Sequence, residues 1–349
     1  MNISRMWTIV RLELTQRTRS VAWYVLMGIF AVLLLIVTVM SFSVFSSSTE
    51  QGGGVYSVVV FFVLLLVVLV SPTLSGNVIN GDRDAATLAP LQITLASTAD
   101  IVLGKFVAAW ITGLAFLAVA VPFLLAAMLG GGVGPATLIV SLLVLILETG
   151  VVAAIGVGLS GVLAKPLFSV ASTYLVVAAL VIGTLIAFML GGGAVRDQGV
   201  SYTRDYVYDR DTGQIVEPQV CGEWEEYSFD VPRFDYFWGF LAANPFVILA
   251  DATPSAFDVN GNPQDMFGWI KAGVRGAQVT PELEQRWDGC DSTSWQDDSL
   301  SVEDVEQATV PSWWVGVAIQ LIIAGGLMWW GWARTRTPAR RLPPGTRIA

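Results

Sequence analysis

Long apolar runs dominate the chain, and charged residues interrupt them only rarely. No charged residue occurs between Arg19 and Glu50, and none occurs between Glu50 and Asp82. A helix crosses the hydrocarbon core of a bilayer in about 20 residues, so each of these stretches is long enough to span a membrane. The first and second spans are therefore predicted near residues 21–43 and 55–75, joined by a loop rich in Ser and Gly.

Further spans follow from the same reasoning. Residues 106–147 are uncharged, and the sequence GGGVGP at 130–135 divides this stretch into spans 3 and 4. Span 4 ends at Lys165-Pro166, span 5 covers residues 167–190, and span 6 covers residues 311–333. The predicted fold is an α-helical integral membrane protein with six transmembrane helices.

Residues 1–20 precede the first span and are more polar than the spans. On a helical wheel five apolar side chains fall within about 100° of one another and form a stripe: Ile3, Met6, Trp7, Val10 and Leu14. Arg5, Arg11 and Arg19 lie off this stripe. Such a helix lies flat at the membrane surface; the alternative is a ragged start of span 1.

Charge divides the chain into two parts. The net charge is −9, but residues 194–310 hold 22 of the 28 acidic and only 7 of the 19 basic residues. Basic residues gather before span 1, in the tail 334–349, and in the loops that hold Arg83, Lys105 and Lys165. The positive-inside rule makes these parts cytoplasmic. Both termini are thus predicted inside the cell membrane and residues 194–310 outside it, with the Lys105 ammonium reaching the headgroups.

A small mixed or β-rich extracytoplasmic domain is predicted between spans 5 and 6. Alternating residues around 200–207 and 227–231 indicate short strands. Cys221 and Cys290 both lie in this segment, and an extracytoplasmic compartment favours a disulfide between them. Closing a loop of that length would stabilise the domain by about 4 kcal/mol.

The uncharged stretch 236–250 also belongs to the outer segment. It is too short to span a bilayer comfortably, and it contains Asn244-Pro245. It is therefore either an interfacial or re-entrant piece or a core element of the outer domain.

Two features argue against an enzyme. The chain contains no His, which removes the usual general base and the commonest zinc ligand. A phosphate-binding loop is also missing, because Gly104-Lys105 is followed by Phe106 instead of Ser or Thr. No cofactor or metal is predicted on this chain, so any dependence on ATP and Mg would come from a second polypeptide. The charge distribution also argues against nucleic acid as a partner.

Span 4 carries Glu148, the one acidic residue well inside a predicted span. A carboxylate in hydrocarbon is costly unless it is protonated, paired or facing water. Glu148 is therefore either a cavity-lining or proton-relay group, or a neutral side chain hydrogen-bonded to a neighbouring helix. Gly150, Ala154 and Gly158 share one face of the same span, which favours close packing within this chain or against a second copy.

The polar segment 80–100 separates spans 2 and 3. Its charged residues come first and its leucines follow around Pro90: Asp82, Arg83 and Asp84, then Leu88, Leu91 and Leu95. Pro90 fits the first turn of a helix, and the leucines repeat at helical spacing. The pattern predicts an amphipathic loop helix, which a simple connector between spans would explain equally well.

This segment resembles one region of a known family. The resemblance is carried by three groups of residues: Asp82-Arg83-Asp84-Ala85-Ala86-Thr87-Leu88, then Leu91, Thr94 and Ser97, then Gly104-Lys105 with Ala108-Ala109-Trp110. Their order is similar to that in ABC-2 type transporter permeases, and residues 336–347 resemble the tail of actinobacterial members. The likeness covers roughly residues 1–195 and 305–349. Ala86 stands where Gly is usual, and the insertion before span 6 is longer than is common in the family.

The resemblance implies a permease subunit that forms a homodimer or heterodimer in the lipid membrane and binds two ATPase subunits. The residues implied to couple it to the ATPase are Asp82, Arg83, Asp84, Thr87, Leu88, Leu91 and Thr94. ATP-driven closure of the ATPase pair would then export a substrate that the sequence does not identify. Two rivals stay open: a proton-coupled secondary transporter that uses Glu148, and a membrane-anchored receptor or scaffold that acts through the acidic outer domain.

Overall fold

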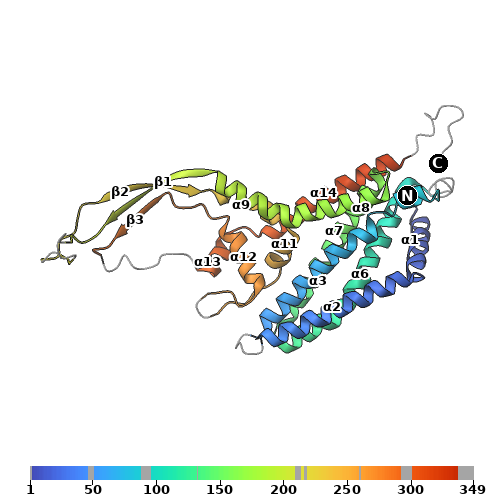
Figure 1. Cartoon of the computed structure of the whole chain (residues 1–349), viewed down its shortest axis with the longest axis horizontal. Helices are drawn as coiled ribbons and strands as arrows, with labels where there is room; N and C mark the ends of the chain where they lie inside the picture. The colour runs from blue at the N-terminus through green and yellow to red at the C-terminus, as the bar shows by residue number, and fades with distance from the viewer. Residues whose placement is uncertain are drawn as a thin grey trace.

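The computed structural model of the chain is a helical bundle from which a narrow β-sheet arm projects (Figure 1). It describes residues 2–45, 51–87, 96–131, 133–208, 214–215, 218–258, 261–291 and 301–336. The chain begins at the end of the bundle opposite the arm, and the last helix returns to that same end (Figure 1). We call these two ends the termini side and the arm side.

Six helices in the described part of the chain are long and apolar enough to cross a membrane. They correspond to the predicted spans: α2 (Val21–Phe45), α3 (Gln51–Ser75), α6 (Thr98–Gly131), α7 (Pro135–Val162), the run of α8 (Pro166–Ala178), η1 (Ala179–Gly183) and α9 (Thr184–Ala194), and α14 (Ser312–Thr335). Pro135 and Pro166 each stand in the first turn of a helix, where a missing N–H costs nothing. The short α4 (Asn80–Asp84) follows α3 and extends the second span.

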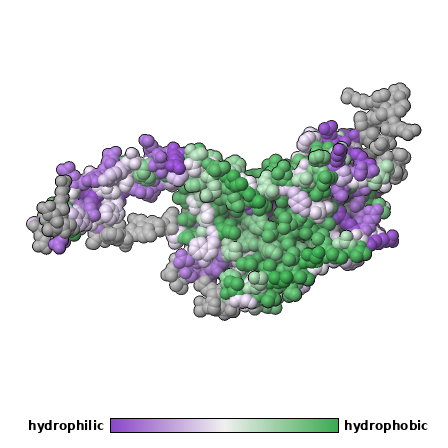
Figure 2. Space-filling view, in the orientation of Figure 1, coloured by the Kyte–Doolittle hydropathy of each residue, from purple (hydrophilic) through white to green (hydrophobic). Residues whose placement is uncertain are grey.

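The core of the bundle lies where α3, α6 and α7 meet. Its fully buried side chains include Tyr56, Leu64, Phe116 and Leu145. The Tyr56 hydroxyl also forms a hydrogen bond of 2.7 Å with Ser141 of α7. Large apolar side chains face outward from α2, α9 and α14, and the visible bundle surface is apolar between two polar ends (Figure 2). This distribution is compatible with a multi-pass membrane protein.

The N-terminal helix α1 (Ile3–Thr18) packs along α6 on the termini side. Asn2 caps it by accepting a hydrogen bond from the Ser4 N–H at 3.0 Å. Ile9 and Val10 are buried, whereas Ile3 and Trp7 are 72% and 44% exposed. The predicted apolar stripe is thus divided: one edge faces the protein, and the other edge is open to the surroundings.

The arm is a three-stranded sheet in the order β2-β1-β3. β1 (Arg196–Arg204) pairs antiparallel with β2 (Glu225–Pro232) and parallel with β3 (Glu284–Asp288). The sequence predicts the first two strands but not β3, which is short and polar and owes its extended shape to its pairing with β1.

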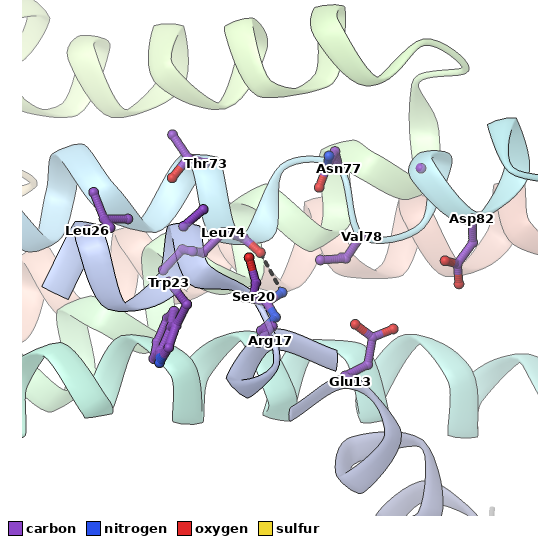
Figure 3. A pocket seen from close by; sticks show the side chains of 12 residues that line it. Glu13, Arg17, Ser20, Trp23, Leu26, Thr73, Leu74, Asn77, Val78 and Asp82 are labelled. Carbon is purple, nitrogen blue, oxygen red and sulfur yellow. Dashed lines mark hydrogen bonds between the residues drawn. The ribbon is translucent and has the colours of Figure 1, made fainter. Parts of the chain in front are cut away.

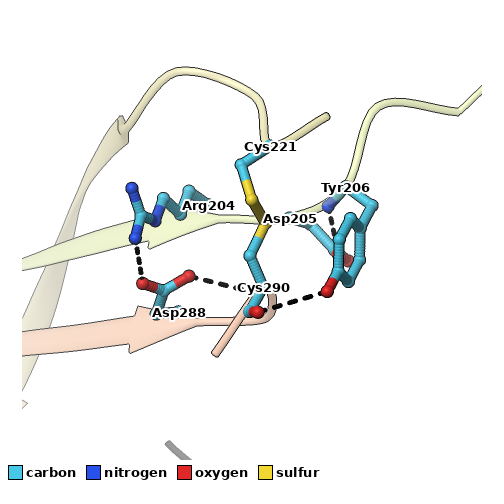
Figure 4. Close-up of a disulfide and its surroundings, with 6 residues drawn as sticks. All are labelled: Arg204, Asp205, Tyr206, Cys221, Asp288 and Cys290. Atoms are coloured by element: carbon cyan, nitrogen blue, oxygen red, sulfur yellow. Dashed lines mark hydrogen bonds and ion pairs between the residues drawn. A yellow bond between two sulfur atoms is a disulfide. The ribbon is translucent and has the colours of Figure 1, made fainter. Parts of the chain in front are cut away.

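A disulfide joins the loop before β2 to the end of β3. The Cα atoms of Cys221 and Cys290 lie 6.1 Å apart, which confirms the predicted pairing. Around it, Arg204 pairs with Asp288, and the Tyr206 hydroxyl donates to the Cys290 carbonyl at 3.2 Å (Figure 4). The hydrogen bond from Arg204 holds the pKa of Asp288 below its usual range. The far end of the arm is therefore held by covalent and ionic contacts in place of a hydrophobic core.

Arg233 anchors the other end of the arm. Its guanidinium donates to both carboxylate oxygens of Asp235, at 2.8 and 2.6 Å, and also pairs with Asp197 of β1. The Tyr236 ring stacks under it, 4.1 Å from the guanidinium carbon. The hydrogen bonds from Arg233 lower the pKa of Asp235, so this pairing is retained at neutral pH.

Short helices fill the space between the arm and the bundle: η2 (Phe234–Tyr236), α10 (Trp238–Ala242), α11 (Pro245–Ala252), α12 (Met266–Gly276) and α13 (Val302–Ala308). The uncharged stretch 236–250 folds as α10 and most of α11, and it packs against α12, α14 and α7. Asn244 caps α11, and its Nδ2 donates to the Val181 carbonyl inside the π-helical turn η1 at 2.7 Å. Tyr236 and Phe240 are exposed, whereas most of residues 241–250 are buried and join the outer helices to the spans.

Candidate functional site

A buried ionic cluster joins α1, α4 and α6 on the termini side. The side chain of Lys105 is 1% exposed, and its Nζ lies 2.7 Å from Asp82 Oδ2. The same ammonium group contacts the carboxylate of Glu13 on α1. A buried ammonium group is tolerable only when it is paired, and here two carboxylates share it. We call Glu13, Asp82 and Lys105 the ionic cluster.

The expectation that Lys105 reaches the headgroups is not met, because its side chain is buried and its ammonium group is paired inside the protein. Glu13 was not predicted from the sequence as a partner of Lys105. A usable signal was present, since Glu13 is the one acidic residue before Glu50. An acid on an otherwise basic surface helix is a reason to search for a buried cation nearby.

The segment that leads into α4 is also fixed to the end of α7. Ser160 Oγ accepts hydrogen bonds from the N–H groups of Ile79 and Asn80, at 2.9 and 3.2 Å. It donates in return to Asn80 Oδ1 at 3.1 Å. Asn80 is fully buried, so the polar contact is shielded from water and fixes the position of α4.

A glycine allows α1 to approach α6 closely. A Cβ on Gly104 would lie 3.1 Å from Ile9 and 3.2 Å from the Met6 carbonyl, both on α1. The N–H of Asn2 also donates to Asp100 Oδ1 at 2.9 Å, close to the start of α6. The start of α6 thus contacts the N-terminal segment from Asn2 to Glu13.

The predicted coupling residues are placed in different ways. Asp82 belongs to the ionic cluster, whereas Arg83 and Asp84 make no ion pair with any described residue. Thr87 closes a turn by donating its N–H to the Asp82 carbonyl at 2.8 Å. Leu88, Leu91 and Thr94 lie outside the described residues, so the predicted loop helix over them stays a prediction.

Ala86 adopts a left-handed backbone conformation, with φ of 57°. This is the position at which the family pattern has Gly. Steric strain in this region destabilises an Ala by about 1–2 kcal/mol. Gly avoids the strain but loses more conformational entropy on folding, which costs about 0.5–1 kcal/mol.

Ala86→Gly is therefore expected to raise the free energy of unfolding by about 0.5 kcal/mol. The measurement is chemical unfolding of the full chain in detergent. Ala85→Gly is the matched control, because Ala85 has an ordinary φ of −76° and its replacement should lower stability. Equal effects at both positions would contradict the strain at Ala86.

Lys105→Met tests the ionic cluster. It removes the ammonium group, keeps most of the side-chain volume and leaves the two carboxylates facing each other. Because Glu13 and Asp82 are 15% and 27% exposed, water will partly solvate them. The expected loss is therefore about 2 kcal/mol, below the range for a fully buried pair.

The control for this variant is Lys165→Met, which changes an exposed lysine on the same side of the bundle. A double-mutant cycle with Glu13→Gln should give a coupling energy above about 0.5 kcal/mol. An Lys105→Met effect no larger than the control would show that the cluster does not stabilise the bundle.

Glu148 lies at the contact between α7 and α14. It is 1% exposed, and its Oε1 has no hydrogen-bond partner among the described residues. Gln320 of α14 lies beside it and donates its Nε2 hydrogen to the Ala243 carbonyl at 3.1 Å. Gln320 Oε1 is also without a partner in the described part of the chain. The two spans thus meet through a polar pair with unused acceptors.

The small residues after Glu148 pack inside this chain. A Cβ on Gly158 would lie 2.6 Å from the backbone of Leu327 in α14. Ala154 lies in a cluster with Leu180 and Ala324, while Gly150 faces the Trp110 ring of α6. Of the two alternatives left open for this face, the structure therefore uses packing within the chain.

A second buried ion pair lies on the arm side and was not found from the sequence. Asp251 of α11 accepts from Arg275 Nε of α12 at 2.7 Å. Its other oxygen accepts from the N–H groups of Ser312 and Trp313, at 2.6 and 2.9 Å. Asp251 therefore caps the start of α14 and holds the outer helices onto the last span.

Comparison of the sequence with protein-family models and with curated proteins finds no match. The likeness to ABC-2 type permeases therefore remains a resemblance of motifs. The class of protein that the fold defines is a bundle of six membrane-length helices with a disulfide-bonded polar arm.

Proposed function

We propose that this chain is the membrane-spanning permease subunit of an ATP-driven exporter, moved by a separate ATPase chain. The ATPase would bind on the termini side, at α4 and the segment that follows it. In this proposal the termini side is cytoplasmic and the arm lies outside the cell membrane. Two ATPase subunits and a second permease chain would complete the assembly.

The observation that carries the proposal is the attachment of α4 to three other helices. The ionic cluster ties it to α1 and α6, and Ser160 ties it to α7. A partner that displaces α4 would therefore displace the termini side of several spans together. The ATPase can drive a movement of the spans only if it binds one arrangement of them more tightly than another. The attachment of α4 to α1, α6 and α7 would carry that preference to the spans.

The test is purification of the full chain from its native membranes. An ATPase chain is expected to co-purify, and vesicles that hold both chains should hydrolyse ATP faster than the ATPase alone. Purification of the folded chain without any ATPase, from membranes solubilised by several mild detergents, would count against the proposal.

A second candidate, a proton-coupled transporter, is favoured by one observation. Glu148 is buried, and its Oε1 has no described partner, as a group that gains and loses a proton within a transport cycle would require. In vesicles, transport driven by an imposed pH gradient without ATP, and lost in Glu148→Gln, would favour this candidate. Transport that requires ATP and survives Glu148→Gln is the outcome expected from the exporter proposal.

A further inference from the structure

A pocket of about 420 Å³ lies beside the ionic cluster, between α1, the start of α2 and the end of α3. Its lining is divided into two halves, as Figure 3 shows. Glu13 and Asp82 line the half next to α4, Trp23 and Leu26 of α2 line the other half, and Arg17 lies between them. A ligand that fills this pocket must therefore be charged at one end and apolar at the other.

Arg17 supplies the positive charge of the pocket. Its guanidinium donates from Nη2 to the Leu74 carbonyl at 2.7 Å, and no carboxylate among the described residues is within ion-pair distance. Burial lowers the pKa of this guanidinium, and the nearby Glu13 carboxylate opposes that effect. A guanidinium carries five N–H donors, so most of its donors are available to an anion.

The opposite charge comes from the ionic cluster. Glu13 and Asp82 share the single ammonium group of Lys105, so two carboxylates face one ammonium and an excess of one negative charge remains. Arg17 balances this excess. The charged part of the pocket is thus neutral overall, but its positive and negative groups stand apart, so its complement is a zwitterion. A plain anion would meet the carboxylates, and a plain cation would meet the guanidinium.

We propose that this pocket binds a phosphoethanolamine group, with the phosphate on Arg17 and the ammonium on the free carboxylate oxygens of Glu13 and Asp82. The apolar half indicates that the group is the headgroup of a membrane lipid, whose chains run along α2. Val25 and Ile29 on the same helix are also apolar and exposed. A choline headgroup has no N–H to donate to the carboxylates, so it is the natural comparison. The site needs a membrane around the bundle but is independent of any transport activity.

The experiment measures lipid binding to the full chain in detergent by native mass spectrometry. Phosphatidylethanolamine is expected to bind about ten-fold more tightly than phosphatidylcholine or phosphatidylglycerol, since each of these lacks a set of charge-assisted hydrogen bonds. Free glycerophosphoethanolamine, which keeps the singly charged phosphodiester and the ammonium of the lipid, distinguishes the two sources of the group. Competition by it at equal concentration would show a site for the soluble compound, and no competition would show a lipid site.

Arg17→Gln should reduce phosphatidylethanolamine binding at least about ten-fold. Arg11→Gln, on an exposed position of the same helix, should leave it unchanged. Replacing Arg17 also removes its hydrogen bond to the Leu74 carbonyl, which could disturb the fold. A second variant therefore fills the pocket and leaves this hydrogen bond in place. Gly81 lines the pocket, and the nearest atoms to a Cβ there are those of Asn77 at 3.9 Å. Gly81→Leu is thus expected to fold and to lose the lipid.

Two results would overturn the proposal. One is equal binding of the ethanolamine, choline and glycerol lipids by the unaltered chain. The other is undiminished phosphatidylethanolamine binding by folded Gly81→Leu. Neither result bears on the exporter proposal, because neither measures ATPase binding or transport.

Discussion

On the exporter proposal, replacing Arg83 with Glu is expected to lower ATP-driven transport at least about ten-fold while leaving the bundle folded. Arg83 lies in the last turn of α4, is partly exposed and makes no ion pair with a described residue. Its charge is therefore available to an acidic group on a partner chain. A Glu at this position would repel that acidic group. Transport and ATP hydrolysis are measured together in vesicles that hold this chain and the proposed ATPase partner.

Two control variants separate coupling from folding. Arg83→Lys keeps the charge and should retain most of the transport. Arg11→Glu makes the same charge reversal on an exposed face of α1 and should have little effect. Unchanged transport in Arg83→Glu would mean that α4 is only a connector between spans. Loss of folding in Arg83→Glu would mean that the residue has a structural role.

Asp251→Asn is expected to lower the free energy of unfolding by about 3–5 kcal/mol, the range for breaking a buried ion pair from one side. The side chains of Asp251 and Arg275 are 0% and 5% exposed, so the guanidinium would be left as an uncompensated buried charge. Asn keeps an oxygen that can accept from the N–H groups at the start of α14. The variant therefore tests the charge more than the helix cap.

Thermal or chemical unfolding in detergent measures this effect. The matched control is Asp230→Asn on the arm, where the pair with Arg196 is 3.8 Å long and both side chains are more than half exposed. An exposed pair contributes at most about 1 kcal/mol. If the two substitutions have similar effects, Asp251 does not hold the outer helices onto α14.

The spans were predictable because the property that defines them is local. An uncharged run of about 20 residues is recognisable without its neighbours, and breaks such as Lys165-Pro166 act through the backbone of the same residues. The disulfide was predictable for a related reason, since Cys221 and Cys290 are the sole cysteines of the chain. The strands β1 and β2 show some alternation of their own, whereas β3 does not.

The candidate site was only partly predictable. Asp82 was identified by its neighbours in sequence. Glu13 and Lys105 belong to other helices, and the fold brings them into the ionic cluster. The prediction that the Lys105 ammonium reaches the headgroups was wrong because the fold buries this side chain beside the carboxylates of Glu13 and Asp82. The pair of Asp251 with Arg275 belongs to the same class of contact.

The sequence by itself determined which segments form membrane-length helices, where the polar arm lies along the chain and which cysteines pair. Only the tertiary structure decided that α1 packs closely on α6, that most of residues 241–250 are buried, and that a pocket with a charged and an apolar part lies beside the ionic cluster. Helix length and apolarity are properties of consecutive residues, whereas a buried charge is stabilised by partners that the folded chain brings together.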